Sequence, residues 1–336
     1  MIVARTIAEA RSTLAELPRP LGLVPTMGAL HEGHLALVRA ARGRCATVAA
    51  SLFVNPTQFG AGEDFTRYPR DVQRDFGLFE KTGVDVVFAP TADEMYPNGF
   101  RTVVHVGGPI TEKYEAEERP SHFDGVATIV TKLFTIVTPD VAFFGEKDAQ
   151  QLALIRRVAR DLDLPVEVAG VATVREPDGL AMSSRNAYLT PEQRAIAPDL
   201  YRALLAGRAA ALEPGGTPKE AIVAAAMTLA MPDRSLVTDE DRLRELKGDA
   251  PPEPPRIHIE YLDVVDADTF VQERELDARS LMIACGRLDS TRLLDNVSLT
   301  PAPVIPASVA TLSGSSTDRS HLVTPQGAYP GRDATQ

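Results

Sequence analysis

The first half of the chain repeats one pattern, in which short apolar runs rich in strand-forming residues alternate with segments that have helical spacing. Continuous apolar runs separated by helices are typical of a parallel sheet buried on both faces. The apolar runs lie at residues 21–25, 46–54, 84–89, 141–144 and 166–174, and helical spacing is clear at 34–44 and 149–162. With right-handed crossovers, this pattern predicts a doubly wound α/β domain over residues 1–174.

The second half has a different pattern of helices and strands. Two alanine-rich segments near residues 191–212 and 218–231 read as helices, and strand-like runs follow at 257–265 and 281–284. This predicts a smaller α+β domain over residues 175–300. Residues 233–255 are acidic and end in PPEPP, which indicates a solvated insertion loop, and residues 301–336 lack apolar periodicity, which indicates a disordered tail.

Composition excludes several classes of protein. A net charge of −11 argues against a nucleic-acid partner, because phosphate backbones are bound by clustered Lys and Arg. The N-terminal residues carry scattered charges rather than the apolar core of a signal peptide, and the longest apolar run, residues 45–54, is too short to span a bilayer. Cys45 and Cys285 are expected to be buried free thiols. We therefore expect a cytoplasmic protein without a membrane partner.

Polar residues follow four of the predicted strands. They form the stretches PTMGALHEGH (25–34), NPTQF (55–59), GEKDAQQ (145–151) and REPDGLAMSSRN (175–186). Open α/β sheets bind ligands beyond the carboxyl ends of their strands. The four stretches are therefore expected to meet in one pocket.

The first stretch has the residues of an anion site. Gly28 and Gly33 allow the backbone to approach a ligand closely, and His31 and His34 lie at the start of a helix on one face. Two imidazoles near the positive end of a helix dipole can donate hydrogen bonds to phosphate. A zinc site of the metalloprotease type needs histidines four apart, whereas these are three apart. A structural role for both histidines stays open.

The other stretches offer complementary groups. Lys147 can neutralise a triphosphate, or it can be a surface lysine. Ser183, Ser184 and Arg185 suit a pyrophosphate held by a mobile loop. Gln58 and Gln151 are neutral residues that both donate and accept hydrogen bonds, which suits a hydroxy acid.

At these residues, the chain resembles the pantothenate synthetases. The motifs that carry the resemblance are PTMGALHEGH, SLFVNPTQF, RYPR, RPSHFDGV, FFGEKDAQQL, DGLAMSSRN, EYL and TRLLDN, in the family's order and over about residues 1–300. The wider group is the nucleotidyltransferase superfamily, whose HxGH and KMSKS-type motifs look like residues 31–34 and 182–185. Tyr114 and Asp124 depart from residues that are common in the family.

The resemblance implies a fold and an activity. The fold would be a Rossmann-like doubly wound sheet with a smaller C-terminal lid domain, usually dimeric. The activity would be an AMP-forming ligation of pantoate to β-alanine through a pantoyl adenylate, within coenzyme A biosynthesis. ATP would be a substrate, and Mg²⁺ would be bound mainly through its phosphates. The metal's protein ligands stay unassigned.

The resemblance also implies roles for individual residues. His34 would be a proton donor, and His31, Lys147, Ser183, Ser184 and Arg185 would assist catalysis. Pantoate would be bound by Gln58, Gln151 and Asn55, and Gln58 would also contact β-alanine. The residues implied to bind ATP are Pro25, Thr26, Met27, Gly28, Ala29, Leu30, His31, Glu32, Gly33, His34, Gly145, Glu146, Lys147, Asp148, Val174, Met182, Ser183, Ser184 and Arg185.

Two other functions remain compatible with this fold. One is another adenylyl-transferring member of the superfamily, such as an aminoacyl-tRNA synthetase, which the acidic charge disfavours. The other is a non-catalytic nucleotide sensor, which the presence of Lys147 and of both histidines disfavours. A requirement for β-alanine rather than RNA, and the production of AMP, would separate the three.

Overall fold

A computed structural model of the protein describes residues 1–60, 63–230 and 255–300. The predicted tail and nearly all of the predicted acidic insertion lie outside the described residues, and the predicted domain boundary between residues 174 and 175 stays a prediction. Within the described ranges, no helix is long and apolar enough to cross a membrane.

The larger sheet has six parallel strands in the order β1-β4-β3-β2-β5-β6. The predicted doubly wound α/β class is confirmed, and β1 is an addition that the apolar pattern did not reveal. From β2 the chain builds outward to β3 and β4 on one side, and it later adds β5 and β6 on the other side. The point between β2 and β5 is therefore a topological switch point. The strands are β1 (Ile2–Ala4), β2 (Leu21–Thr26), β3 (Thr47–Leu52), β4 (Val86–Phe88), β5 (Val141–Gly145) and β6 (Glu167–Val171).

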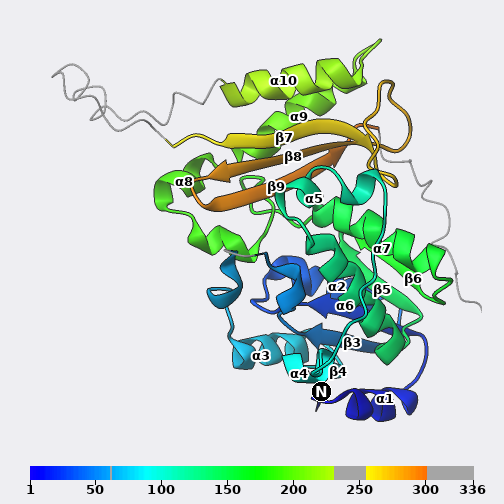
Figure 1. Ribbon diagram of the computed structural model, residues 1–336. Helices are drawn as coiled ribbons and strands as arrows, with labels where there is room; N and C mark the ends of the chain where they lie inside the picture. Colours follow the sequence, from blue (N-terminus) through cyan, green and yellow to red (C-terminus); the bar gives the residue numbers. More distant parts are fainter. Residues whose placement is uncertain (61–62, 231–254, 301–336) are drawn as a thin grey trace, which may run out of the picture. The chain divides into compact units, whose positions relative to one another are not determined.

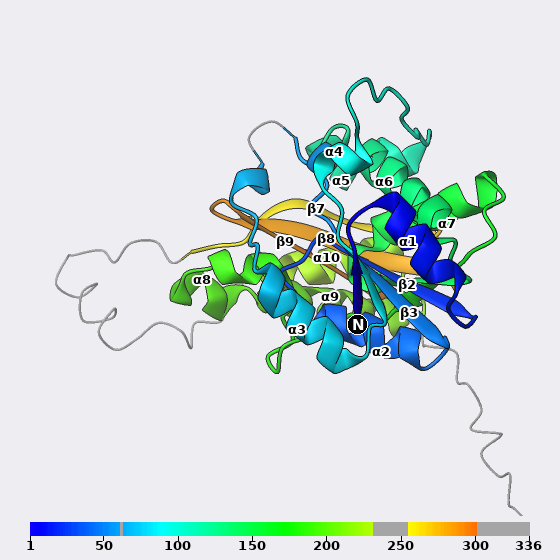
Figure 2. The ribbon, with the colours of Figure 1, turned by 90° about the horizontal axis from the view of Figure 1, so that it is seen from below.

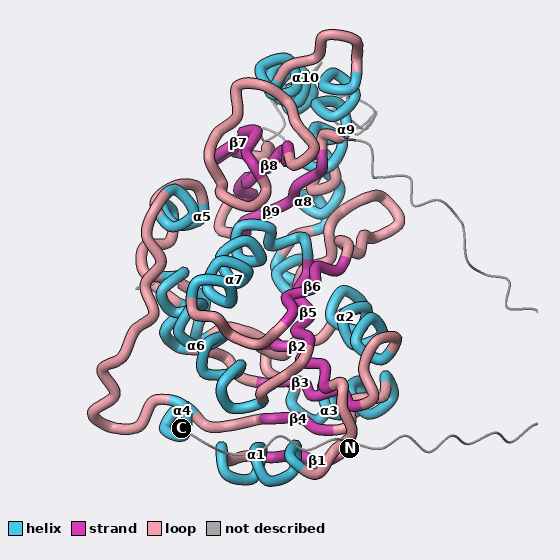
Figure 3. The backbone as a smooth tube through the Cα atoms, turned by 90° about the vertical axis from the view of Figure 1, so that its right-hand side faces the viewer, coloured by secondary structure: helices cyan, strands magenta, loops and turns pink. Residues whose placement is uncertain are grey.

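Helices cover both faces of this sheet (Figure 3). One core contains apolar side chains of α1 (Ile7–Ala15), α6 (His122–Val137) and α7 (Ala149–Asp161), and the other contains those of α2 (Glu32–Arg42) and α3 (Val72–Thr82). Burial on both faces explains why the central strands are apolar throughout. Short elements complete this part: α4 (Ala92–Met95), α5 (Glu115–Glu118) and the 3₁₀ turns Pro56–Gln58, Asp64–Thr66, Pro109–Thr111, Glu146–Asp148 and Ser184–Tyr188.

The smaller sheet is antiparallel, with strands β7 (His258–Asp266), β8 (Ser280–Leu288) and β9 (Thr291–Ser298). Helices α9 (Asp199–Leu212) and α10 (Pro218–Ala230) pack on one face, as Figures 1 and 2 show. Successive residues of β8 alternate accordingly. Met282 and Ala284 join the core under these helices, whereas Ile283 packs into the core of the larger sheet.

Two details of this part differ from the sequence prediction. The segment near residues 191–212 is two helices, α8 (Pro191–Ile196) and α9, and not one. Pro198 stands at the break, where its ring cannot supply a backbone N–H to continue the first helix. Strand β9 was recognised only as a motif, because charged and amide side chains interrupt its apolar pattern.

Candidate active site

The four predicted stretches meet at the carboxyl ends of β2 and β5, on the switch point of the larger sheet. A single cavity there is lined from all four segments. Among the residues predicted to bind substrates, those that line this cavity are Pro25, Thr26, Met27, His31, Gly33, His34, Gln58, Gly145, Lys147, Asp148, Gln151, Val174, Met182, Ser183, Ser184 and Arg185.

His31 and His34 begin helix α2 by capping one another. His31 is the N-cap residue, and its Nδ1 accepts a hydrogen bond from the Gly33 N–H at 3.2 Å. His34 Nδ1 accepts from the His31 N–H at 3.3 Å, and the ring centroids are 4.1 Å apart. An Nδ1 that accepts is unprotonated, so in the neutral ring the proton is on Nε2. Both imidazoles therefore keep an Nε2–H donor for a ligand.

The surroundings keep both imidazoles neutral. Burial lowers the pKa of His34 to about 3, and the neighbouring His31 ring acts in the same direction. Burial and the charge of Lys147 lower the pKa of His31 to about 4. Protonation of Nδ1 would also be unfavourable, because the new N–H would face the backbone N–H group from which Nδ1 now accepts a hydrogen bond. The site therefore offers two neutral donors near pH 7.

Lys147 follows β5 and contributes the positive charge on this side of the cavity. Its ammonium lies 3.1 Å from Asp148 Oδ1, and its side chain is 20% exposed. The backbone of this turn is held from the smaller sheet, because the Asn296 amide on β9 donates to the carbonyls of Glu146 and Lys147, both at 2.9 Å. Asn296 belongs to the TRLLDN motif, and nothing in that motif alone reveals this positioning contact.

The loop that carries Ser183, Ser184 and Arg185 forms another wall. Ser183 begins a short 3₁₀ turn, and its hydroxyl accepts from the Arg185 N–H at 3.3 Å. The Tyr68 hydroxyl lies beside this loop, 3.4 Å from the Ser184 hydroxyl, and Tyr68 also lines the cavity. Tyr68 belongs to the RYPR motif, to which the sequence analysis assigned no role.

Gln58 is oriented by a chain of buried hydrogen bonds. The Tyr96 hydroxyl donates to Asn55 Oδ1 at 2.8 Å, and Asn55 Nδ2 donates to Gln58 Oε1 at 3.0 Å and to the Gly125 carbonyl at 3.2 Å. Gln58 therefore keeps its Nε2–H₂ group as the donor for a ligand. A Cβ on Gly125 would lie 2.3 Å from the Thr57 carbonyl oxygen, so only glycine allows helix α6 to approach this turn so closely.

A second lobe of the cavity adjoins Gln58, Gln151, Lys147 and Arg185. Arg119 and His122 line this lobe. His122 Nδ1–H donates a hydrogen bond to the Gln58 carbonyl oxygen at 2.8 Å, and His122 Nε2 accepts one from Arg119 at 3.1 Å. Burial and the charge of Arg119 lower the pKa of His122 to about 4. The RPSHFDGV motif pointed to this segment, but the sequence did not reveal its role.

Six predicted substrate-binding residues are not among those that line the main cavity. Glu32 and Glu146 are exposed, and Glu32 pairs with Arg39 on its own helix. Asn55 lies behind Gln58. The remaining three, Gly28, Ala29 and Leu30, are in the loop that precedes His31, and their backbone turns toward helix α3.

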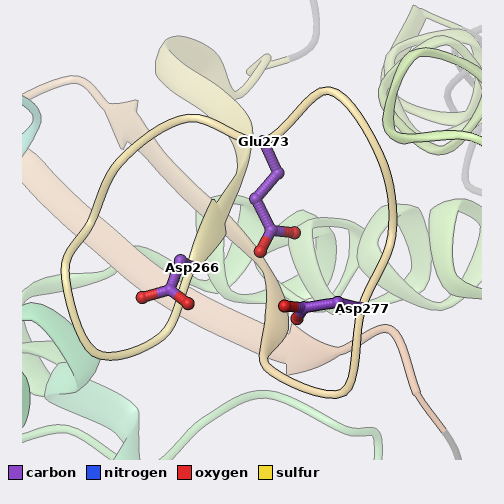
Figure 4. A group of neighbouring side chains, drawn as sticks. All are labelled: Asp266, Glu273 and Asp277. Atoms are coloured by element: carbon purple, nitrogen blue, oxygen red, sulfur yellow. The ribbon is translucent and has the colours of Figure 1, made fainter.

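A group of three carboxylates lies on β7 and on the segment between β7 and β8 (Figure 4). Oxygens of Asp266, Glu273 and Asp277 lie within 4.8 Å of one another. The group is already compensated, because Arg279 donates to Asp266 at 2.6 Å, the Ser280 hydroxyl donates to Glu273, and burial raises the pKa of Glu273. None of the three lines the cavity.

Comparison with known proteins decides the family. The family model for pantoate-beta-alanine ligase matches residues 2–298. The chain belongs to this family. The chain is 48% identical over 298 residues to a pantothenate synthetase of Thermus thermophilus, covering 88% of this chain and 100% of the relative. It is 55% identical over 251 residues to that of Chloroflexus aggregans, covering 73% and 90%.

Solved structures of the family agree. A crystal structure of pantothenate synthetase from Thermus thermophilus matches with a TM-score of 0.79 at 48% identity, covering 90% of this chain and 100% of that one. A pantoate-beta-alanine ligase from Francisella tularensis, crystallised with beta-gamma ATP and beta-alanine, matches with a TM-score of 0.67 at 29% identity, covering 90% and 99%. The family assigns the chain pantoate–β-alanine ligase activity, as the sequence resemblance predicted, and not the function of a sensor or a tRNA synthetase.

Proposed function

We propose that the chain joins pantoate to β-alanine in two steps at the cavity between β2 and β5. In the first step, the pantoate carboxylate attacks the α-phosphorus of ATP, and the bond to pyrophosphate breaks. In the second step, the neutral amine of β-alanine attacks the acyl carbon, and AMP leaves with the bridging oxygen. The observation that carries the proposal is that the neutral imidazoles of His31 and His34 line the same cavity as Gln58 and Gln151.

The phosphates of ATP would lie against the start of helix α2. The Nε2–H groups of His31 and His34 would donate to phosphate oxygens, and Lys147 would neutralise charge on the transferring phosphate. Ser183, Ser184 and Arg185 would bind the leaving pyrophosphate from the opposite wall. Donors that are already oriented lower the barrier because they do not reorganise as charge develops.

Pantoate would bind beside Gln58 and Gln151. The Asn55 contact fixes Gln58 as a donor, which suits the carboxylate and hydroxyl oxygens of pantoate. The adjoining cavity wall is apolar and suits the two methyl groups of pantoate. It consists of Phe53, Val126, Ile129, Val130, Leu133 and Phe144. Gln58 also lines the second lobe, from which β-alanine would approach, with Arg185 as a partner for its carboxylate.

Mg²⁺ is included in the proposal as the counter-ion of the ATP phosphates. Magnesium prefers oxygen ligands, and Asp148 supplies a carboxylate in the cavity beside Lys147, so the residues present fit the ion. When bound, it would offset phosphate charge. The chain's own groups would orient the substrates, and closure of the cavity would keep water from the acyl adenylate.

Isotope transfer tests the reaction. Pantoate labelled with ¹⁸O in its carboxylate should give AMP that carries one label, because one carboxylate oxygen becomes the bridge to phosphorus. Pyrophosphate should be released only when pantoate is present. ADP as the main nucleotide product, or AMP without label, would contradict the adenylate route.

The proposal also covers the oligomeric state and the cellular location of the enzyme. We propose a homodimer in the cytoplasm, as the resemblance to the family suggests. Light scattering of the purified full chain would test the dimer, and cell fractionation would test the location. A monomer at micromolar concentration would overturn the proposed dimer.

A further inference from the structure

Asp75 holds the loop that leads into the histidine pair. It lies in the first turn of helix α3, and its side chain is 2% exposed. Its Oδ2 accepts a hydrogen bond from the Ala29 N–H, and its Oδ1 accepts from the Leu30 N–H, both at 2.9 Å. A carboxylate from one helix therefore binds two consecutive backbone donors of a loop 45 and 46 residues earlier in the chain.

The loop has a backbone conformation that needs such support. Gly28 has φ +87° and Ala29 has φ +51°. The left-handed region costs an L-residue such as alanine about 1–2 kcal/mol. A Cβ on Gly28 would lie 2.9 Å from Asp75 Oδ2, so the loop also approaches the carboxylate too closely for a larger residue. From the other side, Arg74 Nη1 donates to the Leu30 carbonyl at 3.0 Å.

The residue after this loop is His31, which begins helix α2. The conformation of residues 28–30 therefore sets where α2 starts, and with it the direction of the Nε2–H groups of His31 and His34. We propose that Asp75 is a positioning residue for adenylation, which acts by fixing this loop through the two backbone N–H groups. The proposal rests on the proposed phosphate-binding role of the two histidines.

Asp71 provides a matched control at the start of the same helix. Its carboxylate is the N-cap of α3 and accepts from the Arg74 N–H at 3.1 Å, so its hydrogen bond stays within its own helix rather than reaching the loop at residues 28–30. Loss of an N-cap costs about 1 kcal/mol of stability. Asp71→Ala therefore weakens α3 without removing the acceptors of the loop.

The experiment compares Asp75→Asn with Asp71→Ala in pantoate-dependent exchange of pyrophosphate into ATP. In Asp75→Asn, one amide oxygen can still accept, but the amide nitrogen faces the second N–H. Misplacement of reacting groups by about 1 Å costs on the order of 10²-fold in rate. We expect kcat for exchange to fall by about that factor in Asp75→Asn, with a small change in KM for pantoate, and to stay near wild type in Asp71→Ala.

A second variant separates positioning from general stability. Glycine adopts positive φ without the alanine penalty. The double variant Asp75→Asn/Ala29→Gly should therefore recover part of kcat, whereas a role confined to the stability of α3 predicts no recovery. Wild-type kcat in Asp75→Asn, or an equal loss in Asp71→Ala, would overturn the inference.

Hydrogen exchange of the wild-type protein tests the contact without any variant. The Ala29 and Leu30 amides should exchange as slowly as those inside helix α2, and rapid exchange of both would contradict the inference. Failure of the wild-type enzyme to exchange pyrophosphate in the presence of pantoate would instead contradict the proposed function, so the two failures are distinguishable.

Discussion

Arg175 and Asp295 form a buried ion pair with two hydrogen bonds, Nη1 to Oδ2 at 2.5 Å and Nη2 to Oδ1 at 2.9 Å. Their side chains are 17% and 4% exposed. Arg175 also donates to the Gly179 carbonyl at 3.1 Å and lies over the ring of Tyr201. Strand β9 is thereby joined to the base of the loop that carries Ser183–Arg185.

Replacement of Arg175 by Met should destabilise the protein strongly. The change leaves the Asp295 carboxylate buried without its cationic partner, which typically costs about 3–5 kcal/mol. Urea unfolding measures the change in free energy. The exposed pair Arg157–Asp161 on α7 is the control, and Arg157→Ala should leave the free energy of unfolding nearly unchanged, because water screens an exposed pair. Equal effects of the two variants would contradict the importance of burial.

Replacement by Ala should have different effects at the adjacent residues Gln150 and Gln151. At Gln150 it should lower stability, and at Gln151 it should weaken pantoate binding. Gln150 is buried, and its amide donates to the carbonyls of Ile110 and Lys113 and accepts from the Glu115 N–H. Its loss should lower the free energy of unfolding by about 1–3 kcal/mol, because these groups become unpaired. Gln151 lines the cavity. Its loss should raise KM for pantoate about tenfold or more, as expected for one lost substrate hydrogen bond of about 1.4 kcal/mol, with stability unchanged.

His34→Ala should lower the rate of adenylation by about 10²–10³-fold, as for the loss of one oriented donor to a developing charge. Pyrophosphate release with saturating pantoate measures it. His105→Ala is the control, because His105 is exposed and pairs with Asp124 rather than with cavity residues. A folded His34→Ala variant with near-wild-type release would remove His34 from the mechanism.

Half-buried neutral histidines should make stability depend on pH. In the folded state the pKa of His122 is about 4 and that of His34 about 3, both below the ordinary value of 6.5. Below pH 6.5 the unfolded chain binds protons that the folded chain does not, so the contribution of these histidines to the free energy of unfolding should be constant above about pH 7 and fall as pH decreases toward 4. Each histidine contributes at most about 1.4 kcal/mol per pH unit.

Unfolding in urea at several pH values measures this dependence, and the His122→Asn variant should lose the share of the slope that belongs to His122. An unchanged slope in that variant, or a stability that does not vary between pH 7 and 5, would show that these imidazoles titrate normally.

The sequence predicts the parts of this molecule that leave a periodic or local pattern. Strands β2 to β5 are recognisable because nearly all of their residues are buried, and the meeting of His31, Lys147 and Gln58 follows from the position of each after a strand. Strand β1 is too short to show a pattern, and β9 is obscured by side chains that bond across to other segments, such as Asn296.

Contacts between a side chain and a backbone segment far away along the chain leave no pattern in the sequence. Asp75 binds N–H groups, which every residue except proline carries, so neither Ala29 nor Leu30 reveals its partner. The orientation of Gln58 depends on Tyr96, 38 positions later, through Asn55. Such relationships are set by tertiary packing, and only the folded chain shows them.

Under the proposed role of His31 and His34, the neutral state of the two imidazoles would set how tightly the enzyme binds ATP relative to the transition state. A pair of imidazolium cations would attract the resting triphosphate strongly and would hold pyrophosphate after the reaction. In the proposed mechanism, neutral Nε2–H donors would bind the resting nucleotide modestly, and their hydrogen bonds would strengthen as charge gathers on the bridging oxygen. Only such a difference between ground state and transition state accelerates the reaction. If the two histidines bind the phosphates as proposed, their neutral state would thus favour turnover over retention of nucleotide.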